Sequence, residues 1–263
     1  MTEPEYLSRE ELAEVLDIVL TAGQAMLQSG AVSFRTEKTM AQIGLGMGAD
    51  RLELYVTPTG IIATAFSGSE QRTRVGRVGM LGVNMAQIVA FYKLARYMAM
   101  VGGGLSATRH RVALIKSTPR ELPTWFMVLA VGLACGAFSQ MLGGGVAEFI
   151  ASMGGAMIAQ LLRLRLIRAG VTPFAITVFC GVVASLLAYG ISQGIHASRT
   201  DLAMIGSVLL LVPGVPLVNS VIDLSNNDLV SAVSRGTLAL MLVLSIGIGI
   251  MLTLWITGLN IVP

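Results

Sequence analysis

The feature that most constrains the fold is an uncharged run of 17 residues, 202–218. With its flanks, this run is long enough to cross a bilayer core of roughly 30 Å at about 1.5 Å per residue, which predicts a membrane helix. Pro213 and Pro216 interrupt it because each removes a backbone donor, and Gly214 between them tolerates dihedrals that other residues resist. The helix is therefore expected to kink or unwind at this point.

Polar residues follow the interruption directly. Asn219 and Asp223 are spaced by one helical turn, which places them on a common face. Unwound backbone at membrane depth must be surrounded by protein or water, and transporters often build solute or ion sites beside such broken helices. We predict a site of this kind, in which a carboxylate binds and releases a proton, formed by Pro213, Gly214, Pro216, Asn219 and Asp223. The alternative is that Asp223 lies at the cytoplasmic rim of an ordinary membrane helix that contains proline.

Composition and charge divide the chain into a polar head and a membrane body. The chain is 54% hydrophobic and 13% charged, far from the roughly 25% charged residues of soluble domains. Of 18 basic residues 13 precede Thr124, as do 11 of 15 acidic ones. We predict a cytoplasmic α+β domain over residues 1–120 and a transmembrane domain over 121–263. The acidic start lacks the basic and apolar regions of a signal peptide, which favours a head that stays in the cytoplasm.

The head has the patterns of a small α+β domain. Ser8 and Glu11 form a capping-box pattern ahead of a helix that stops at Ser29 and Gly30. Alternation of apolar and polar residues around the turn 57–60 predicts a hairpin followed by a third strand. The further predicted elements are helices 36–47, 83–100 and 106–117, the last capped by Ser106, and strands 52–56, 61–66 and 71–78.

The body is predicted to be an all-α bundle of five transmembrane helices. With the N-terminus inside, 17 of 18 basic residues lie on the cytoplasmic side, and only Arg199 lies outside. The C-terminus is then external. The predicted spans are 124–142, 143–162, 171–195, 202–222 and 237–256, with Arg163, Arg165, Arg168 and Arg235 in cytoplasmic loops.

Other charged residues are weaker candidates for the site. Glu148 is the only acidic residue well within the first two spans, which suits a proton or substrate role, unless it lies shallow enough to reach headgroup water. The glycines 143–145 before it favour a tight turn. Arg72, Arg74 and Arg77 suit the gathering of an anionic substrate, although a solvated strand face or a lipid-headgroup contact is the favoured explanation.

An enzymatic head is the main rival hypothesis. Ser33, His110 and Asp50 are available for a spatial triad, but no nucleophile elbow, phosphate loop or metal-ligand spacing accompanies them. Cys135 and Cys180 lie in apolar segments and are expected to be packing residues. We therefore predict no enzyme, metal or cofactor. A membrane-anchored hydrolase-like protein and a non-transporting membrane scaffold stay open as alternatives.

Four stretches resemble one known family. They are SGAVSFRTEKTM (29–40), VTPTG (56–60), TRVGRV (73–78) and LVPGVPLVNSVIDLSNND (211–228). Together, and in this order, they resemble the threonine/serine exporter (ThrE) family. Long members look like a cytoplasmic head followed by two halves of membrane spans, whereas this chain has the head and only the first half.

The chain thus resembles the short, split form of the family (the YjjP type). That resemblance implies a small YjjB-type membrane subunit as partner, with self-association as the competitor. It also implies location in the bacterial inner membrane and export of small polar metabolites. These are threonine and serine for the long form and dicarboxylates such as succinate for the split form.

Overall fold

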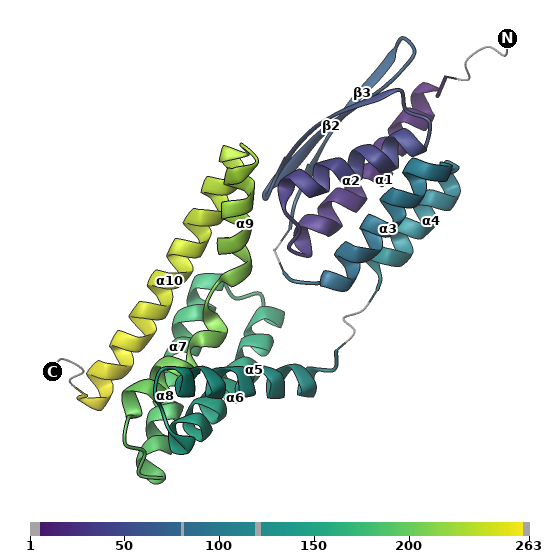
Figure 1. The fold of residues 1–263 in the computed structure, drawn as a ribbon. Coiled ribbons are helices and arrows are strands. Elements are labelled where there is room, and N and C mark those ends of the chain that lie inside the picture. Colours follow the sequence, from purple (N-terminus) through teal and green to yellow (C-terminus); the bar gives the residue numbers. More distant parts are fainter. Residues whose placement is uncertain (1–5, 80–81, 119–121, 260–263) are drawn as a thin grey trace. The chain divides into compact units, whose positions relative to one another are not determined.

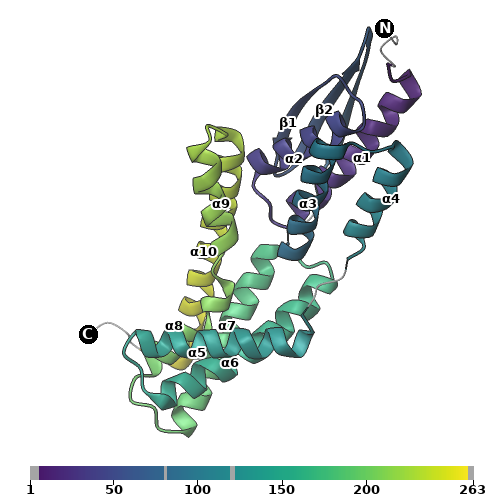
Figure 2. The same cartoon turned by 45° about the vertical axis from the view of Figure 1, so that its right-hand side comes forward.

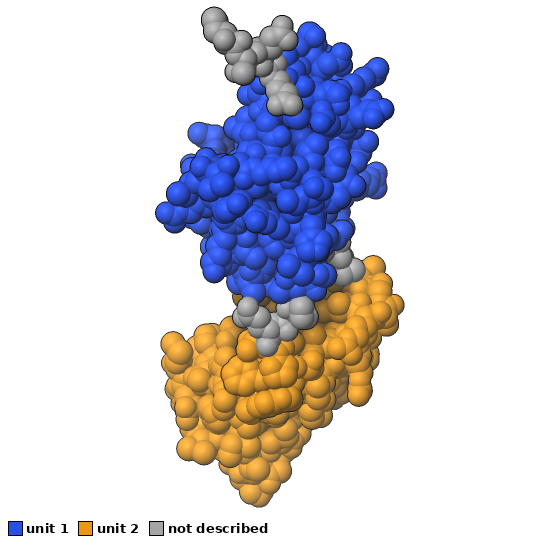
Figure 3. All heavy atoms as spheres, turned by 90° about the vertical axis from the view of Figure 1, so that its right-hand side faces the viewer, with its two compact units in different colours: residues 1–121, 215–236 blue, residues 122–214, 237–263 orange. Residues whose placement is uncertain are grey.

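The computed structural model describes residues 6–79, 82–118 and 122–259. The chain divides into two compact units, coloured separately in Figure 3. Unit 1 comprises Met1–Glu121 and Val215–Gly236, and unit 2 comprises Leu122–Gly214 and Thr237–Pro263. A segment that the sequence assigns to the membrane region therefore belongs to the same compact unit as the head.

Helix α1 (Arg9–Gln28) is the centre of unit 1. Its predicted capping box is confirmed, since Ser8 Oγ accepts from the Glu11 amide at 3.3 Å and Glu11 Oε2 accepts from the Ser8 amide at 2.8 Å. The helix ends at Ser29, and Gly30 then adopts a φ of 92°, which favours glycine. Both ends of α1 are thus encoded locally.

Three more helices and a sheet complete the head. The three-stranded sheet is antiparallel in the order β1-β2-β3, and the pairing of Thr57 with Gly60 confirms the predicted hairpin. Helix α2 begins at Ser33 rather than at residue 36, and the residue before α4 is Gly104, so the predicted Ser106 cap is wrong. The elements are α2 (Ser33–Gly46), β1 (Arg51–Thr57), β2 (Gly60–Ser67), β3 (Glu70–Arg77), α3 (Met85–Val101) and α4 (Leu105–Lys116).

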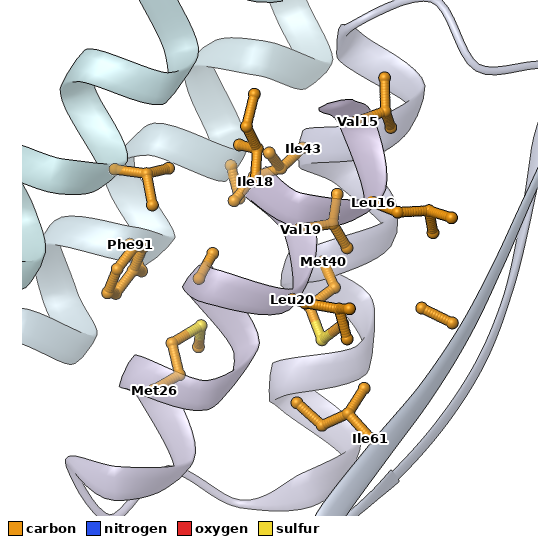
Figure 4. Close-up of a cluster of buried hydrophobic side chains, with 14 of the residues drawn as sticks. Val15, Leu16, Ile18, Val19, Leu20, Met26, Met40, Ile43, Ile61 and Phe91 are labelled. Carbon is orange, nitrogen blue, oxygen red and sulfur yellow. The ribbon is translucent and has the colours of Figure 1, made fainter. Parts of the chain in front are cut away.

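The core of the head includes large aliphatic, aromatic and sulfur-containing side chains (Figure 4). Leu16 and Met26 of α1, Met40 of α2, Ile61 of β2 and Phe91 of α3 are each 0% exposed. Figures 1 and 2 show α1 and α2 along one face of the sheet, with α3 and α4 on the far side of these two helices. Burial of this apolar area supplies the main driving force for folding in water.

A helical hairpin from the C-terminal part of the chain also belongs to unit 1. It consists of α9 (Gly214–Ser225) and the first two turns of α10 (Leu229–Thr257), which run side by side in Figures 1 and 2. Ser220 Oγ donates to the Ala232 carbonyl at 2.7 Å across the pair, and Asp228 Oδ1 accepts from the Ser231 amide at 3.2 Å. The second contact caps the start of α10.

Unit 2 is helical. Among the described residues, α5, α6, α7 and α10 are long and apolar enough to span a membrane, and α8 and η1 with α9 add a fifth candidate if they form one broken span. This confirms a membrane protein with a small sheet-containing part. The elements are α5 (Thr124–Met141), α6 (Val146–Arg168), α7 (Pro173–Gly194), α8 (Thr200–Ser207) and the 3₁₀ helix η1 (Leu209–Leu211).

Two helices are longer than predicted. Helix α6 continues to Arg168, and α10 starts at Leu229, so the arginines assigned to loops lie inside helices. Arginine is a good helix former, and at the end of α6 Arg165 and Arg168 also complement the negative end of the helix dipole. The positions of the charged residues therefore did not predict the end of α6 or the start of α10.

The helices of unit 2 pack through small residues. Ala159, Ala184 and Ala188 are fully buried, and a Cβ added to Gly155 would lie 2.5 Å from the Ala184 carbonyl oxygen. Such close backbone approach is typical of helices that associate in lipid. Cys135 and Cys180 are buried free thiols of this interior, as predicted.

Candidate functional site

The predicted break in the fourth span is present. Helix η1 ends at Leu211 and α9 starts at Gly214, with Val212 and Pro213 between them. The Gly214 amide donates to the Val212 carbonyl at 2.9 Å, so it no longer donates to Leu210 as in a regular helix. Pro216 lies in the first turn of α9, where a missing amide costs little, so Pro213 is the proline that interrupts the helix.

An arginine of α6 compensates for part of this break. The Leu210 carbonyl accepts a hydrogen bond from Arg163 Nη1 at 3.2 Å. The break removes the amide that would normally donate to this oxygen. The guanidinium donates to the carbonyl instead, which lipid hydrocarbon cannot do. The sequence placed Arg163 in a loop, and this contact was missed.

The polar face of α9 is buried inside unit 1. Asn219 is 7% exposed and Asp223 is 0% exposed; Asn219 bonds the loop between α1 and α2, and Asp223 bonds the first residue of α2. Asn219 Nδ2 donates to the Gly30 carbonyl at 2.8 Å, and the Ser33 amide donates to Asp223 Oδ1 at 3.2 Å. The predicted common face is confirmed, and its partners are backbone groups 189 and 190 residues away in the chain.

Arg235 completes this polar cluster from α10. Its side chain is 2% exposed, Nη2 donates to the Ala31 carbonyl at 2.9 Å, and Nε lies 3.0 Å from Asp223 Oδ2. Two opposite charges are therefore buried together. Additional hydrogen bonds offset part of the desolvation of such a pair, and here the Ser33 amide donates to Asp223 Oδ1 while the Ala31 carbonyl accepts from Arg235 Nη2. We call Ser33, Asp223 and Arg235 the carboxylate cluster.

The carboxylate cluster lies at the N-terminus of α2 for a local reason. The residue before this helix is Val32, which has no side-chain acceptor, so the first amides of α2 have no local cap. Asp223 caps one of them from α9, where a negative charge also favours the positive end of the helix dipole. The Ser33 hydroxyl is buried without a hydrogen-bond partner among the described residues.

Glu148 has a different environment, in unit 2. It is 3% exposed, and its two oxygens accept from the Gly145 amide at 2.7 Å and the Arg199 amide at 2.8 Å. These bonds cap α6 and hold the segment that leads into α8. The glycines before it form the predicted turn, with Gly143 at a φ of 100°. Glu148 and the polar face of α9 thus belong to separate units.

The three arginines of β3 do not share one face of the sheet. Arg72 and Arg74 pair with the buried residues Ala65 and Ala63, which places them on the side of α1, and Arg74 forms an ion pair with Asp17 there. Arg77 pairs with Gly60 and points to the other face. The structure brings together two of the three.

The residues considered for an enzymatic head have unrelated partners. Ser33 belongs to the carboxylate cluster, Asp50 Oδ2 accepts from the Gly68 amide at 2.7 Å, and His110 is exposed on α4. Nothing in these contacts arranges a nucleophile beside a base.

Sequence reasoning missed Arg235 and the α1–α2 loop as partners of Asp223. Arg235 was counted only as a topology charge, although one arginine in a long apolar stretch is itself a signal that a partner exists. The loop sequence SGAVSF was noted for its resemblance but had no role assigned.

Comparison with known proteins finds a matching family and relatives whose names agree with it. The family described as "Putative threonine/serine exporter" (ThrE) matches residues 17–257. The chain is 29% identical to the "Probable succinate transporter subunit YjjP" of Klebsiella aerogenes, over 96% of this chain and 97% of that one. With the protein of the same name in Escherichia coli (strain K12) it is 27% identical, over 97% and 99% of the two chains.

A longer relative is matched only in part. The "Probable threonine/serine exporter" of Mycobacterium tuberculosis is 23% identical over 92% of this chain but only 46% of its own length. No solved structure matches the chain. The family match, the relatives' names and the apolar helices agree on a membrane transporter rather than an enzyme, and the chain belongs to the threonine/serine exporter family.

Proposed function

We propose that this protein is one subunit of an inner-membrane exporter of small carboxylates and related polar metabolites, and that a second, small membrane subunit completes it. The observation that carries the proposal is the length of the match. The chain covers 97% and 99% of relatives named as transporter subunits but 46% of a relative named as an exporter. The missing half of the long exporter is then the second subunit, of the YjjB type. Self-association of this chain is the competing arrangement.

The solute site is proposed at the broken helix. Pro213, Gly214 and Pro216 start α9 as a separate helix, and Asn219 and Asp223 give it a polar, buried face. Broken helices of this kind provide free backbone groups and side chains to solutes in transporters. Asp223 is the carboxylate proposed to bind and release a proton in each cycle.

Two further elements have proposed supporting roles. Glu148 is a second candidate for ion binding, since an intramembrane carboxylate is a functional hypothesis by default. Arg72, Arg74 and Arg77 are proposed to attract anionic solute on the cytoplasmic side, with Arg72 and Arg74 acting together on one face of the sheet. The N-terminus is then inside and the C-terminus outside.

Efflux from cells tests the proposal. Succinate, threonine and serine efflux is measured in a strain that lacks every related gene and expresses this chain, the presumed partner or both. Efflux is expected only from the pair, and Asp223→Asn is expected to abolish it while the protein stays in the membrane. Full efflux from this chain alone would refute the second subunit. The absence of efflux for all three solutes would refute the exporter.

A further inference from the structure

The donors of the carboxylate cluster are arranged around a single carboxylate. The Ser33 amide at the N-terminus of α2 and the guanidinium of Arg235 both approach Asp223, at 3.2 Å and 3.0 Å. All three residues are at most 2% exposed. A helix N-terminus and a guanidinium are the groups that proteins most often use to hold carboxylates.

Asp223 satisfies these donors incompletely. The Ser33 hydroxyl is fully buried and has no hydrogen-bond partner in the described part of the chain. Arg235 Nε is close to Asp223 Oδ2, yet its N–H is not aligned for a hydrogen bond. A carboxylate can accept about four hydrogen bonds. A carboxylate that is not attached to the backbone of α9 can therefore accept hydrogen bonds from the Ser33 hydroxyl and Arg235 Nε that Asp223 does not accept.

We propose that Ser33 and Arg235 form a carboxylate-binding site that Asp223 occupies in this structure and that a carboxylate of the solute takes over during transport. This inference rests on the proposed function and assigns the residues that would hold a carboxylate of the solute. Asp223 is then an internal substitute for the ligand.

Burial of the site links the exchange to an opening movement. A solute reaches Arg235 only if the α9–α10 hairpin separates from the α1–α2 loop, which breaks the bonds from Asn219 to Gly30 and from Arg235 to Ala31. A buried guanidinium without an anion is strongly unfavourable. Asp223 and Arg235 are both on the hairpin, so the hairpin is expected to close over Arg235 only with Asp223 or a solute carboxylate beside it.

Binding to the purified full-length chain in detergent tests the exchange. Radiolabelled succinate is the probe in equilibrium dialysis, with succinamide as its uncharged analogue, and thermal unfolding is followed with and without succinate. The variants are Asp223→Asn, Arg235→Gln and the double variant, which has no charge in the cluster. Asp201→Asn, which removes an aspartate from unit 2, is the matched control.

Asp223→Asn is expected to bind succinate at least about tenfold more tightly than the unchanged chain, because its internal competitor is gone. Its unfolding temperature should rise with succinate, since a ligand that binds only the folded state stabilises it. The double variant should fold and bind no succinate. Asp201→Asn should behave as the unchanged chain does, and succinamide should bind none of them.

The inference is overturned if folded Asp223→Asn binds succinate no more tightly than the unchanged chain, or if the double variant binds as well as Asp223→Asn. Efflux measured in parallel separates this failure from a failure of the proposed function. Intact efflux by the unchanged pair of subunits with unaltered binding in Asp223→Asn rejects the inference alone. Tighter binding in Asp223→Asn, combined with no efflux of succinate, threonine or serine from the unchanged pair of subunits, supports the carboxylate site and rejects the exporter.

Discussion

The two units differ in the size of the side chains that they bury. Unit 1 encloses large side chains such as Leu16 and Phe91 at 0% exposure, as a water-soluble domain does. Unit 2 buries mostly alanine, glycine and serine, with some larger side chains such as Met204 and Leu211, and leaves many large side chains outside, with Trp255 83% exposed and Met141 82% exposed. Lipid chains are as apolar as leucine, so nothing drives large side chains inward in a membrane, and close backbone packing stabilises the helices instead.

The α9–α10 hairpin is an exception to this contrast. It comes from the apolar part of the sequence, yet its buried groups include Asn219, Asp223 and Arg235, which bond the α1–α2 loop and the start of α2. Polar contacts of this kind, rather than apolar area, connect the hairpin to the rest of unit 1.

The largest expected effect comes from breaking the buried ion pair. Arg235→Gln leaves Asp223 charged and unpaired, which should lower the free energy of unfolding by about 3–5 kcal/mol. Denaturant unfolding of the full chain in detergent, followed by circular dichroism, measures it. Adding Asp223→Asn to this variant should restore most of the loss, because both charges are then absent.

Arg74→Gln is the surface counterpart of that change. Its ion pair with Asp17 is about half exposed, so its loss should cost less than about 1 kcal/mol. Equal losses for Arg74→Gln and Arg235→Gln would show that the hairpin is not buried against the head.

A large-to-small substitution should next distinguish the two units by its effect on the free energy of unfolding. Leu16→Ala leaves a cavity in the core of unit 1 and is expected to cost about 2–5 kcal/mol in the same unfolding experiment. Leu244→Ala is the matched change on α10 in unit 2, where the side chain is 58% exposed, and should cost far less. A similar loss at both positions would contradict the contrast between the cores.

The reverse change should affect unit 2 more. Gly155→Ala places a methyl group 2.5 Å from the Ala184 carbonyl oxygen, so α6 and α7 must move apart, at an expected cost of about 1–3 kcal/mol. Gly190→Ala is the control on α7, since nothing lies within 4 Å of the added atom there. This control should be neutral or stabilising, because alanine favours helices by up to about 1 kcal/mol over glycine. Thermal aggregation in detergent compares the two.

The smallest effect is a pH dependence at the hairpin. Desolvation raises the pKa of Glu37 on α2 above its ordinary value, and the negative charge of Asp228 adds to this. A carboxyl whose folded-state pKa is raised contributes stability that is present below its unfolded pKa and is lost as pH rises through the folded one. Mild acid should therefore slightly raise the hydrogen-exchange protection factors of the α9–α10 hairpin, which correct for the intrinsic pH dependence of exchange, and Glu37→Gln should remove this rise. A response that survives in Glu37→Gln belongs to another group.

Local chemistry determined much of the fold directly from the sequence. The capping box of α1, the hairpin at residues 57–60 and the break at Pro213 depend on residues that are close together in the chain, and all three were predicted. The membrane class followed from the scarcity of charge in the second half. The ends of the helices were less predictable, because Arg163 and Arg235 lie inside α6 and α10 and not in the neighbouring loops.

Tertiary structure alone decided which groups meet. The polar face of α9 was visible in the spacing of Asn219 and Asp223, but its partners lie 189 and 190 residues away, and Arg235 bonds a carbonyl 204 residues away. Hydrogen bonds between distant segments leave no periodic trace in a sequence, since each partner belongs to a helix or loop with its own local pattern. The start of α2 has no local cap, and only the tertiary structure shows that Asp223 supplies one. Any part of the chain can provide the acceptor that the first amides of a helix need.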